Sequence, residues 1–429
     1  MLSTIDSCRI CNSHELYSVI DLGLQSLTSR FPKLHDLSTP NAPMILIKCL
    51  SCGLVQLKDS LASNEMYETQ YGYRSGISNT MKLHLQRYNE QIRSKVVIED
   101  FDSILDIGCN DGTMLRYYPI GRKIGIDPTA KQFASYHEGL EIIPNYFTYQ
   151  NLYDQIDSSI RFKVISSISM FYDLPDPVQF AKDIAKSLHE DGIWTLEQSY
   201  IGTMIDKLSF DTICHEHLEY YALKQIVIIA TLADLKIIHI EFNDCNGGSF
   251  RLYLAKKTSH YSECILPIQS ILEKEKYLDD LNTYSLFMKN CDDEMSKLKL
   301  FIETIHKNGK RIYIYGASTK GNTLLQYINA SNKIIPYAVE RNLDKVGRMT
   351  PGTNIEIISE ETMRNNPPEY LIVLPWHFRD EIIQREDEYL KNGGQLVFPL
   401  PNFEIVSKKE TILITGIDGQ IGYEIKKNI

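Results

Sequence analysis

Two pairs of cysteines near the N-terminus have the spacing of a metal site. Cys8 and Cys11 form the first pair, Cys49 and Cys52 form the second, and two residues separate the members of each pair. Such turns present sulfur atoms at the separation that a tetrahedral zinc ion requires, with Zn–S bonds of about 2.3 Å. Four thiolates would fill every position on the ion, so we expect a structural zinc site. The alternatives are a redox pair and buried cysteines without a metal.

A glycine-rich turn with acidic residues follows a predicted strand in LDIGCNDGTML (105–115), and Asp127 ends the next predicted strand. Close backbone approach at the turn and a carboxylate beyond it suit an adenosine ligand. The GxGxxG pattern of dinucleotide sites is absent and DxGxxxG is present, which favours S-adenosylmethionine over a nicotinamide cofactor. The alternative is a tight turn, with Asp127 capping a helix. The predicted cofactor residues are Asp106, Gly108, Asn110, Asp111, Gly112 and Asp127.

Two histidines flank a glutamate in FDTICHEHLEYYAL (210–223), beyond the predicted strand at 192–199. Enzymes with α/β sheets bind their ligands at that end of the strands. A His–Glu pair can fix the tautomer of an imidazole and raise its basicity, as the removal of a proton from carbon beside a carbonyl requires. A second metal site from His215 and His217, or a loop of solvated histidines, are the alternatives.

A second turn of small residues, in IYIYGASTKGNTLLQYI (312–328), joins a strand to a helix. Small residues, a lysine and a helix N-terminus favour an anion site, although the P-loop pattern is absent. The alternative is a tight turn with a surface lysine. An aromatic face and charges in the next strand and loop suit a base and a diphosphate. The candidate residues are Gly316, Ser318, Lys320, Asn322, Tyr337, Glu340 and Lys345.

Strands and helices alternate around these motifs, which predicts an α/β fold with helices on the faces of a sheet. A polar helical stretch at 266–307 then connects to a second α/β unit. The first unit has predicted strands at 103–107, 123–127, 162–169, 192–199, 236–242 and 249–255, and the second has them at 311–315, 334–339, 369–374 and 394–398. The region before about residue 75 is irregular, so we expect its metal to supply stability that a thin core lacks.

The composition excludes several classes of protein. With 45 Lys and Arg against 55 Asp and Glu, the net charge of −10 argues against a nucleic-acid partner. A chain of 429 residues with 43% hydrophobic residues predicts two or three packed domains. No apolar run approaches the roughly 18 to 20 residues of a membrane span, and nine cysteines, four of them in two pairs, suit a reducing compartment. We therefore expect a cytoplasmic protein without a membrane partner.

Taken in order, the cysteine pairs, the DxGxNDG turn, the CHEH loop and the GASTKGN turn resemble the sugar C-methyltransferase family of nucleotide-deoxysugar biosynthesis. The resemblance extends over about residues 8–405 and includes YGYRSGISNTMKLH (71–84), NGGSFR (246–251) and PLPNF (399–403). It implies a Rossmann-like class I methyltransferase core, flanked by an N-terminal zinc-binding module and a C-terminal Rossmann-like α/β domain that helps to hold the nucleotide of the sugar.

The same resemblance implies roles for individual residues. His217 matches the general base and Glu216 its neighbour, with His215 beside them, and Tyr71 or Tyr73 falls in the segment that lines the sugar site. Two positions depart from the family: Cys214 stands where relatives carry tyrosine, and Tyr172 or Asp173 stands where they carry histidine.

The predicted reaction is methyl transfer from S-adenosylmethionine to a ring carbon, C3, of a nucleotide-linked 4-keto-deoxysugar. The ketone is needed because an unactivated ring carbon is not a nucleophile, whereas deprotonation beside a carbonyl gives an enolate. One alternative is an O- or N-methyltransferase that acts on a sugar or small metabolite. The other is a zinc-containing binding module without catalysis.

Five segments are expected from these motifs. The last reads TILITGIDGQIGYEIKKNI and resembles the opening of a short-chain dehydrogenase or epimerase, which suggests a fusion to, or a neighbouring, sugar epimerase or reductase; the alternative is an appended strand and helix. The predicted segments are a zinc-binding module (1–77), the methyltransferase core (78–262), a helical connector (263–307), the C-terminal α/β domain (308–406) and this last segment (407–429).

Overall fold

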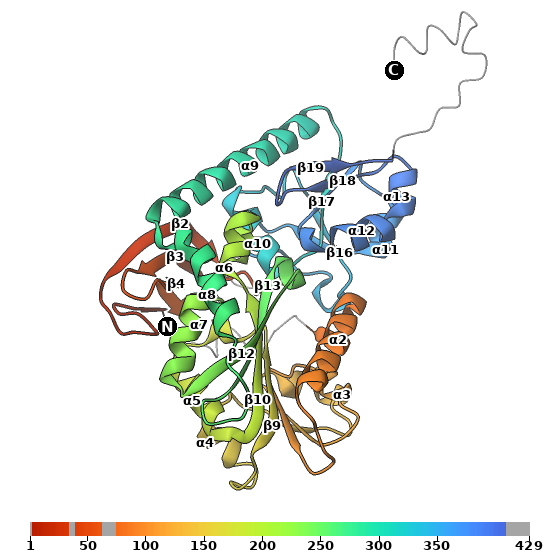
Figure 1. Ribbon diagram of the computed structural model, residues 1–429. Coiled ribbons are helices and arrows are strands. Elements are labelled where there is room, and N and C mark those ends of the chain that lie inside the picture. The colour runs from red at the N-terminus through yellow and green to blue at the C-terminus, as the bar shows by residue number, and fades with distance from the viewer. Residues whose placement is uncertain (1, 34–38, 62–73, 409–429) are drawn as a thin grey trace, which may run out of the picture.

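The structure is a computed structural model that describes residues 2–33, 39–61 and 74–408 (Figure 1). Tyr71, Tyr73 and most of the dehydrogenase-like segment, residues 409–429, lie outside the described residues. Within the described part of the chain, no helix is long and apolar enough to cross a membrane.

A seven-stranded sheet forms the centre of the middle region, in the order β12-β13-β10-β9-β6-β7-β8. Strand β13 is antiparallel to both of its neighbours, and the strands from β10 to β8 are parallel. The α/β prediction is therefore confirmed, with β8 as an additional strand. The strands are β6 (Ser103–Ile107), β7 (Arg122–Ile126), β8 (Glu141–Ile143), β9 (Phe162–Ile168), β10 (Leu188–Ser199), β12 (Leu235–Asn243) and β13 (Ser249–Lys256).

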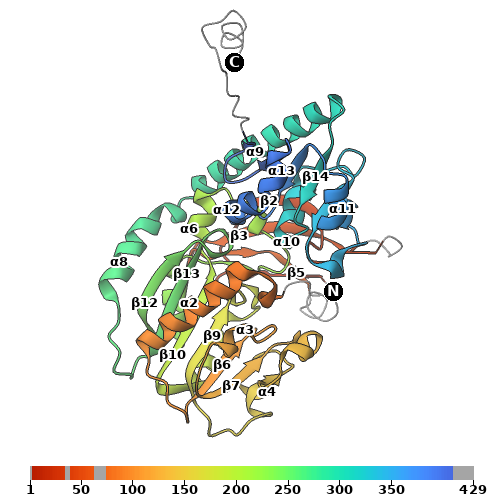
Figure 2. The ribbon, with the colours of Figure 1, turned by 90° about the vertical axis from the view of Figure 1, so that its right-hand side faces the viewer.

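Helices cover both faces of this sheet because alternate strand residues are apolar in both directions. Ile104 packs against α2 (Asn79–Lys95) and α3 (Thr113–Arg116), which lie on one face (Figure 2). Its neighbour Leu105 packs on the other face with α4 (Tyr149–Tyr153), α5 (Pro177–Ser187) and α7 (Leu223–Leu232). Helix α2 begins where the Ser78 side chain accepts a hydrogen bond from the Met81 N–H.

The N-terminal region has more regular structure than its sequence predicts. Strands β2 (Leu16–Ser26) and β3 (Asn41–Cys49) form an antiparallel hairpin, to which β4 (Val55–Leu57) adds a third strand. The expectation of an irregular region was wrong because register shifts in β2 break the apolar alternation that identifies a strand. A short pair, β1 (Leu2–Thr4) and β5 (Asp59–Leu61), lies beside this hairpin.

The fourth strand of this N-terminal sheet comes from the middle region. Strand β11 (Glu219–Tyr220) pairs antiparallel with β4, immediately after the CHEH residues. It follows η4 (Phe210–Thr212) and α6 (Ile201–Asp206). The CHEH loop is therefore attached directly to the cysteine-containing module.

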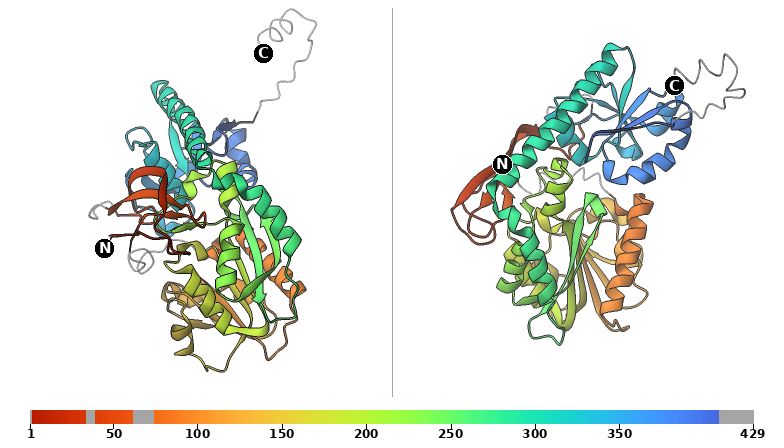
Figure 3. Two further views of the ribbon diagram at one scale, coloured as in Figure 1. Left: turned by 60° about the vertical axis from the view of Figure 1, so that its left-hand side comes forward. Right: turned by 45° about the horizontal axis from the view of Figure 1, so that its top comes forward.

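Two helices, α8 (Ile265–Lys274) and α9 (Leu281–Lys307), connect the core to the C-terminal domain, as expected. Figure 3 shows α9 running past the N-terminal hairpin to the second sheet. That sheet has the order β16-β15-β14-β17-β18-β19, and β19 is its antiparallel strand. Its elements are β14 (Ile312–Tyr315), α10 (Thr319–Tyr327), β15 (Tyr337–Glu340), β16 (Glu356–Ser359), α11 (Glu360–Asn365), β17 (Tyr370–Val373), α12 (Arg379–Arg385), α13 (Asp387–Lys391), β18 (Gln395–Phe398) and β19 (Glu404–Val406).

Candidate functional site

A cavity opens at the carboxyl ends of β6, β7 and β9, where parallel sheets bind their ligands. We call it the strand-end cavity. Of the predicted cofactor residues, Asp106, Gly108, Asn110 and Asp127 line it, whereas Asp111 and Gly112 do not. Further lining residues come from the α2 side (Ser75, Met81, Leu85), from the segment after β8 (Tyr146, Phe147) and from the segment after β9 (Ser169, Met170, Asp173, Leu174, Pro175), among others.

The glycines of the first turn are required by its backbone. Gly108 and Gly112 have φ values of +72° and +75°, which favour glycine. A Cβ on Gly108 would lie 3.1 Å from the Met170 side chain, and one on Gly112 would lie 2.4 Å from Leu140. Gly112 therefore serves the packing of the turn, and Gly108 allows the backbone to line the strand-end cavity.

The Asp127 carboxylate holds two loops together at the cavity wall. Its Oδ2 accepts a hydrogen bond from the Asn110 N–H at 2.8 Å, and its Oδ1 accepts from the Thr129 N–H and hydroxyl, both at 2.6 Å. The expected contact with a ligand and the alternative role of bracing a loop are compatible, because each carboxylate oxygen has more than one lone pair.

The remaining acidic residues of the turn differ in their surroundings. Burial raises the pKa of Asp106 to about 7, an effect that the neighbouring Asp127 charge reinforces and a 2.6 Å hydrogen bond from Ser166 opposes. Asp111 instead accepts from the Gly76 N–H at 2.9 Å and from Thr113. It thereby joins the turn to η1 (Ser75–Ile77), the segment that precedes α2.

His217 has one ring nitrogen available for proton transfer. Its Nδ1 lies 2.7 Å from the Thr212 carbonyl oxygen, so Nδ1 donates and Nε2 is left as the basic nitrogen. Burial, together with the charge of Lys320, lowers the pKa of His217 to about 4, although Glu216 opposes the shift. The ring is therefore neutral at pH 7. The predicted His–Glu pair is corrected here, because a backbone carbonyl and not Glu216 fixes the tautomer.

His217 also lies next to the segment that lines the strand-end cavity. Its ring centroid is 4.2 Å from that of Tyr172, and the Leu218 N–H donates to the Tyr172 carbonyl at 2.7 Å. The next residue, Asp173, lines the cavity. Only the short segment of residues 170–175 therefore lies between the neutral imidazole and the cavity.

His215 and Glu216 face the cysteine-containing module. His215 is 1% exposed, and its Nε2 lies 3.3 Å from the Ala42 carbonyl oxygen. The Glu216 carboxylate accepts from the Thr28 hydroxyl at 3.3 Å. Among the described residues, His215 and His217 belong to no group of three metal-ligating side chains, which argues against the alternative of a second metal site.

The four predicted cysteines come together at one point. Their sulfur atoms all lie within 4.8 Å of one another, with 3.5 Å between Cys8 and Cys52 and 3.6 Å between Cys11 and Cys49. Tetrahedral Zn–S bonds of about 2.3 Å require sulfurs about 3.8 Å apart. The donor set therefore fits a zinc ion, and the separations are too long for disulfide bonds.

The small-residue turn of the C-terminal domain faces the core. Gly316 has a φ of +87°, and a Cβ there would lie 2.7 Å from Pro375. The Ser318 hydroxyl caps α10 by accepting from the Gly321 N–H, and the Lys320 ammonium donates to the Asn246 carbonyl at 2.9 Å. Lys320 thus reaches into the core beside His217, so the alternative of a solvent-exposed surface lysine does not describe it.

The other candidates of this domain divide into two groups. Glu340 accepts from the Ala317 N–H at 3.0 Å, and Lys345 donates to the Ala317 carbonyl at 2.9 Å, so both lie against the turn. Tyr337 begins β15, whereas Glu340 ends it, which places Tyr337 away from the turn and against Tyr313. Asn322 is fully buried and donates to the Thr28 carbonyl at 2.7 Å. The structure therefore does not bring Tyr337 and Asn322 together with the others.

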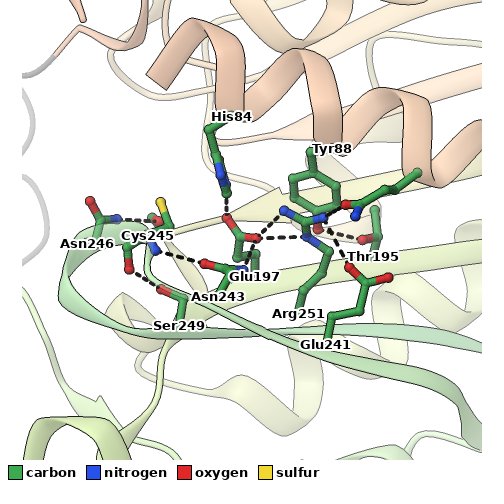
Figure 4. Close-up of polar contacts among 12 residues, drawn as sticks. His84, Tyr88, Thr195, Glu197, Glu241, Asn243, Cys245, Asn246, Ser249 and Arg251 are labelled. Carbon is green, nitrogen blue, oxygen red and sulfur yellow. Dashed lines mark hydrogen bonds and ion pairs between the residues drawn. The ribbon is translucent and has the colours of Figure 1, made fainter. Parts of the chain in front are cut away.

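The motif analysis missed a polar cluster around Glu197 (Figure 4). His84, Glu197 and Cys245 place a ligand atom each within 4.8 Å. Glu197 already pairs with Arg251, however, and a divalent ion would bring two positive charges beside that guanidinium. His84 and Arg251 both fall in segments that the family resemblance includes, whereas no motif marks Glu197.

Three family models match consecutive parts of the chain. A candidate zinc-binding domain matches residues 8–67, a methyltransferase domain matches residues 81–240, and a C-methyltransferase C-terminal domain matches residues 244–401. The third model begins within the core, because its range includes β13 as well as the connecting helices α8 and α9.

Individual proteins are similar over different lengths. C-methyltransferase NovU of Streptomyces niveus is 24% identical over 95% of this chain and 98% of its own length. A tRNA U34 carboxymethyltransferase of Campylobacter lari is 32% identical over 27% of this chain and 40% of its own. Among solved structures, an S-adenosylmethionine-dependent methyltransferase from Clostridium acetobutylicum has a TM-score of 0.32 at 13% identity, covering 42% of this chain and 93% of that one.

Proposed function

Because the chain belongs to the C-methyltransferases and carries their three domains in order, we propose that it methylates a ring carbon, C3, of a nucleotide-linked 4-keto-deoxysugar with S-adenosylmethionine as donor. The observation that carries the proposal is the position of His217. Its basic Nε2 belongs to a neutral ring, one short segment away from the strand-end cavity.

The strand-end cavity is the proposed cofactor site. Gly108 and Asn110 offer backbone at the turn, and Asp127 offers a carboxylate to the ribose hydroxyls. Asp106 also lines the cavity, whereas Asp111 and Gly112 shape the turn itself. When bound, S-adenosylmethionine supplies an electrophilic methyl carbon. Zinc is the proposed ion of the four cysteines, where it stabilises the module.

His217 is the proposed general base. Its Nε2 accepts the proton from the carbon beside the ketone, and the C–H electron pair becomes the enolate π bond. The enolate carbon would then be the nucleophile for the methyl group that S-adenosylmethionine supplies, with S-adenosylhomocysteine as the leaving group and the ketone restored. The Thr212 carbonyl keeps the hydrogen on Nδ1 throughout, so the correct tautomer is present before the substrate arrives.

The sugar nucleotide is proposed to bind between the core and the C-terminal domain. Lys320, at the seam between the two, carries the positive charge that an anionic diphosphate requires, and the Gly316–Ser318 turn lies beside it. Glu340 and Lys345 fix the shape of this turn. Tyr71 and Tyr73 remain candidates for the sugar side of the site.

The test is incubation with methyl-labelled S-adenosylmethionine and a panel of 4-keto sugar nucleotides, followed by location of the label. Label on a ring carbon beside the ketone supports the proposal, as does deuterium uptake at that carbon in the unmethylated sugar nucleotide recovered from heavy water. Label on oxygen or nitrogen would instead indicate the alternative O- or N-methyltransferase. Absence of S-adenosylmethionine binding in calorimetry would indicate a binding module.

A further inference from the structure

A buried carboxylate, Glu197, lies near the carboxyl end of β10 and directly opposite Arg251 of β13 (Figure 4). Its Oε2 accepts from the Arg251 guanidinium at 2.6 and 2.8 Å and from the Asn243 amide at 2.9 Å. Its Oε1 lies 2.5 Å from the Nε2 of His84, which comes from helix α2. One carboxylate thus joins two strands of the sheet to the helix above them.

Further contacts along the same helix face reinforce this attachment. The Tyr88 hydroxyl lies 2.5 Å from the Thr195 hydroxyl, and the Arg251 guanidinium lies 3.5 Å from the centre of the Tyr88 ring. Arg251 also donates to the Gln91 side chain. His84, Tyr88 and Gln91 follow one another at helical spacing, so a single face of α2 is held by polar contacts to the sheet.

The cost of burying these charges indicates a role beyond stability. Glu197 is 0% exposed, yet the contacts with His84 and Arg251 outweigh the effect of burial and lower the pKa of Glu197. The carboxylate is therefore ionised. Well-packed apolar residues would stabilise such a site as well or better, whereas ion pairs fix relative positions through directional hydrogen bonds.

The contacts around Glu197 position the wall of the strand-end cavity. Met81 and Leu85, on either side of His84 in α2, line that cavity. On the sheet side, the Ser169 N–H donates to the Glu197 carbonyl at 2.7 Å, and Ser169 also lines the cavity. Glu197 is therefore hydrogen-bonded to elements on both sides of the strand-end cavity.

We propose that His84, Glu197 and Arg251 form a clasp that positions helix α2 as a wall of the cofactor cavity, which makes His84 and Glu197 positioning residues for cofactor binding. The proposal rests on the proposed function of the strand-end cavity. Release of the clasp lets α2 move away from the sheet, and the cofactor then loses the apolar contacts of Met81 and Leu85.

The test is calorimetric binding of S-adenosylhomocysteine to the full chain and to His84→Phe, which keeps a ring but removes the hydrogen bond to Glu197. Arg251 still pairs with Glu197 in this variant, so the fold is retained, and circular dichroism checks this. We expect the Kd to rise about 10-fold, because hydrogen bonds to charged groups are worth this factor or more. Hydrogen exchange in residues 79–95 should become faster.

Two further variants separate positioning from general destabilisation. His84→Gln restores an N–H donor to Glu197 and should return the Kd to within about 3-fold of the parent value. Glu190→Gln removes the ion pair of Glu190 with Lys256 on the same two strands, β10 and β13, at the opposite end of the sheet. It should leave the Kd unchanged.

Two results would overturn different statements. Parent-like affinity in a folded His84→Phe chain would refute the clasp and leave the cofactor site intact. Absence of S-adenosylhomocysteine binding to the unaltered chain would refute the cofactor site itself, and the clasp proposal would fall with it.

Discussion

The tautomer of His217 determines what the ring can do. With Nδ1 donating to the Thr212 carbonyl, Nε2 carries the lone pair that a general base needs. We predict that His217→Asn lowers turnover about 10²-fold or more, while both ligands still bind, because asparagine lacks a proton acceptor of comparable basicity. Single-turnover kinetics and calorimetry measure the two quantities separately.

The neighbouring histidine is the matched control for this prediction. His215 is buried against the Ala42 carbonyl. His215→Asn should therefore lower the melting temperature and leave the rate of deuterium exchange beside the ketone nearly unchanged. If His215→Asn abolished that exchange in a folded chain while His217→Asn kept it, the base would have to be reassigned to His215.

The lowered pKa of His217 gives a pH dependence with a definite sign. Its value of about 4 means that the ring stays neutral, and able to accept a proton, well below the ordinary histidine value of 6.5. We predict that kcat/KM, measured where circular dichroism reports a folded chain, does not fall between pH 8 and pH 6 through protonation of this residue. An acidic limb centred near 6.5 that disappears in His217→Asn would contradict it.

Residue types and spacing predicted those groupings of candidate residues that depend on local signals. Cys8, Cys11, Cys49 and Cys52 come together because a CxxC turn is itself a structural unit, and Asp127 lines its cavity because it ends a strand beside the glycine turn. Glu197 could not be found in this way. Its importance depends on a cross-strand partner and a helix that are distant in the chain.

At the scale of elements, the pairing of β4 with β11 connects the cysteine module to the proposed base. The Leu57 N–H donates to the Leu218 carbonyl at 2.8 Å, one residue after His217. Arg9, between the two cysteines of the first pair, donates to the Leu57 carbonyl at 2.9 Å and lies 3.5 Å from the buried Glu219 carboxylate. The module therefore supports the loop of the base from behind.

We predict that Arg9→Gln lowers kcat about 10-fold, while zinc content and the Kd for S-adenosylhomocysteine stay unchanged. Burial raises the pKa of Glu219 and the charge of Arg9 opposes this shift, so removal of the guanidinium favours the protonated carboxyl and also loses the hydrogen bond to the Leu57 carbonyl. The loop can then shift, and displacement of a reacting group by about 1 Å costs up to 10²-fold. Steady-state kinetics and metal analysis measure the effect, with Arg122→Gln, which breaks an exposed pair with Glu141, as control. Unchanged kcat in a folded Arg9→Gln chain would show that the loop does not depend on this contact.

The sequence predicted most strands of the two α/β units because most of them carry a short run of apolar residues. It missed β8, β16 and β19, which are only three or four residues long. Strand β11, two residues long, has no such signal and exists only because β4 offers an edge to pair with. Strand β2 was hidden by its register shifts. Elements that depend on distant partners, or that depart from regular alternation, are therefore the ones that local patterns miss.

At the scale of the whole molecule, all three units meet on the loop that holds His217. The Asp211 carboxylate accepts a hydrogen bond from the Trp376 indole at 2.9 Å, and the Ile213 carbonyl accepts one from the Thr323 hydroxyl at 2.8 Å. These two hydrogen bonds attach the loop to the C-terminal domain. The same domain reaches the cysteine module through Asn322 and Thr28. Motifs predicted the identity of the units, but the contacts between them involve residues that are hundreds of positions apart.

This arrangement predicts that loss of the metal affects more than the cysteine module. Cys49→Ser should lose zinc and lower the melting temperature, because the free energy of metal binding is part of the folding free energy in such a site. Since β4 and Thr28 contact the other units, we also expect faster hydrogen exchange in residues 210–220, far from the substitution in sequence. Mass spectrometry of exchanged peptides and metal analysis provide the measurements.

Cys264→Ser, at a half-buried cysteine before α8, is the control and should change neither quantity. Stoichiometric zinc in Cys49→Ser would contradict the ligand assignment, whereas loss of zinc with unchanged exchange in 210–220 would show that the module folds independently of the loop it touches.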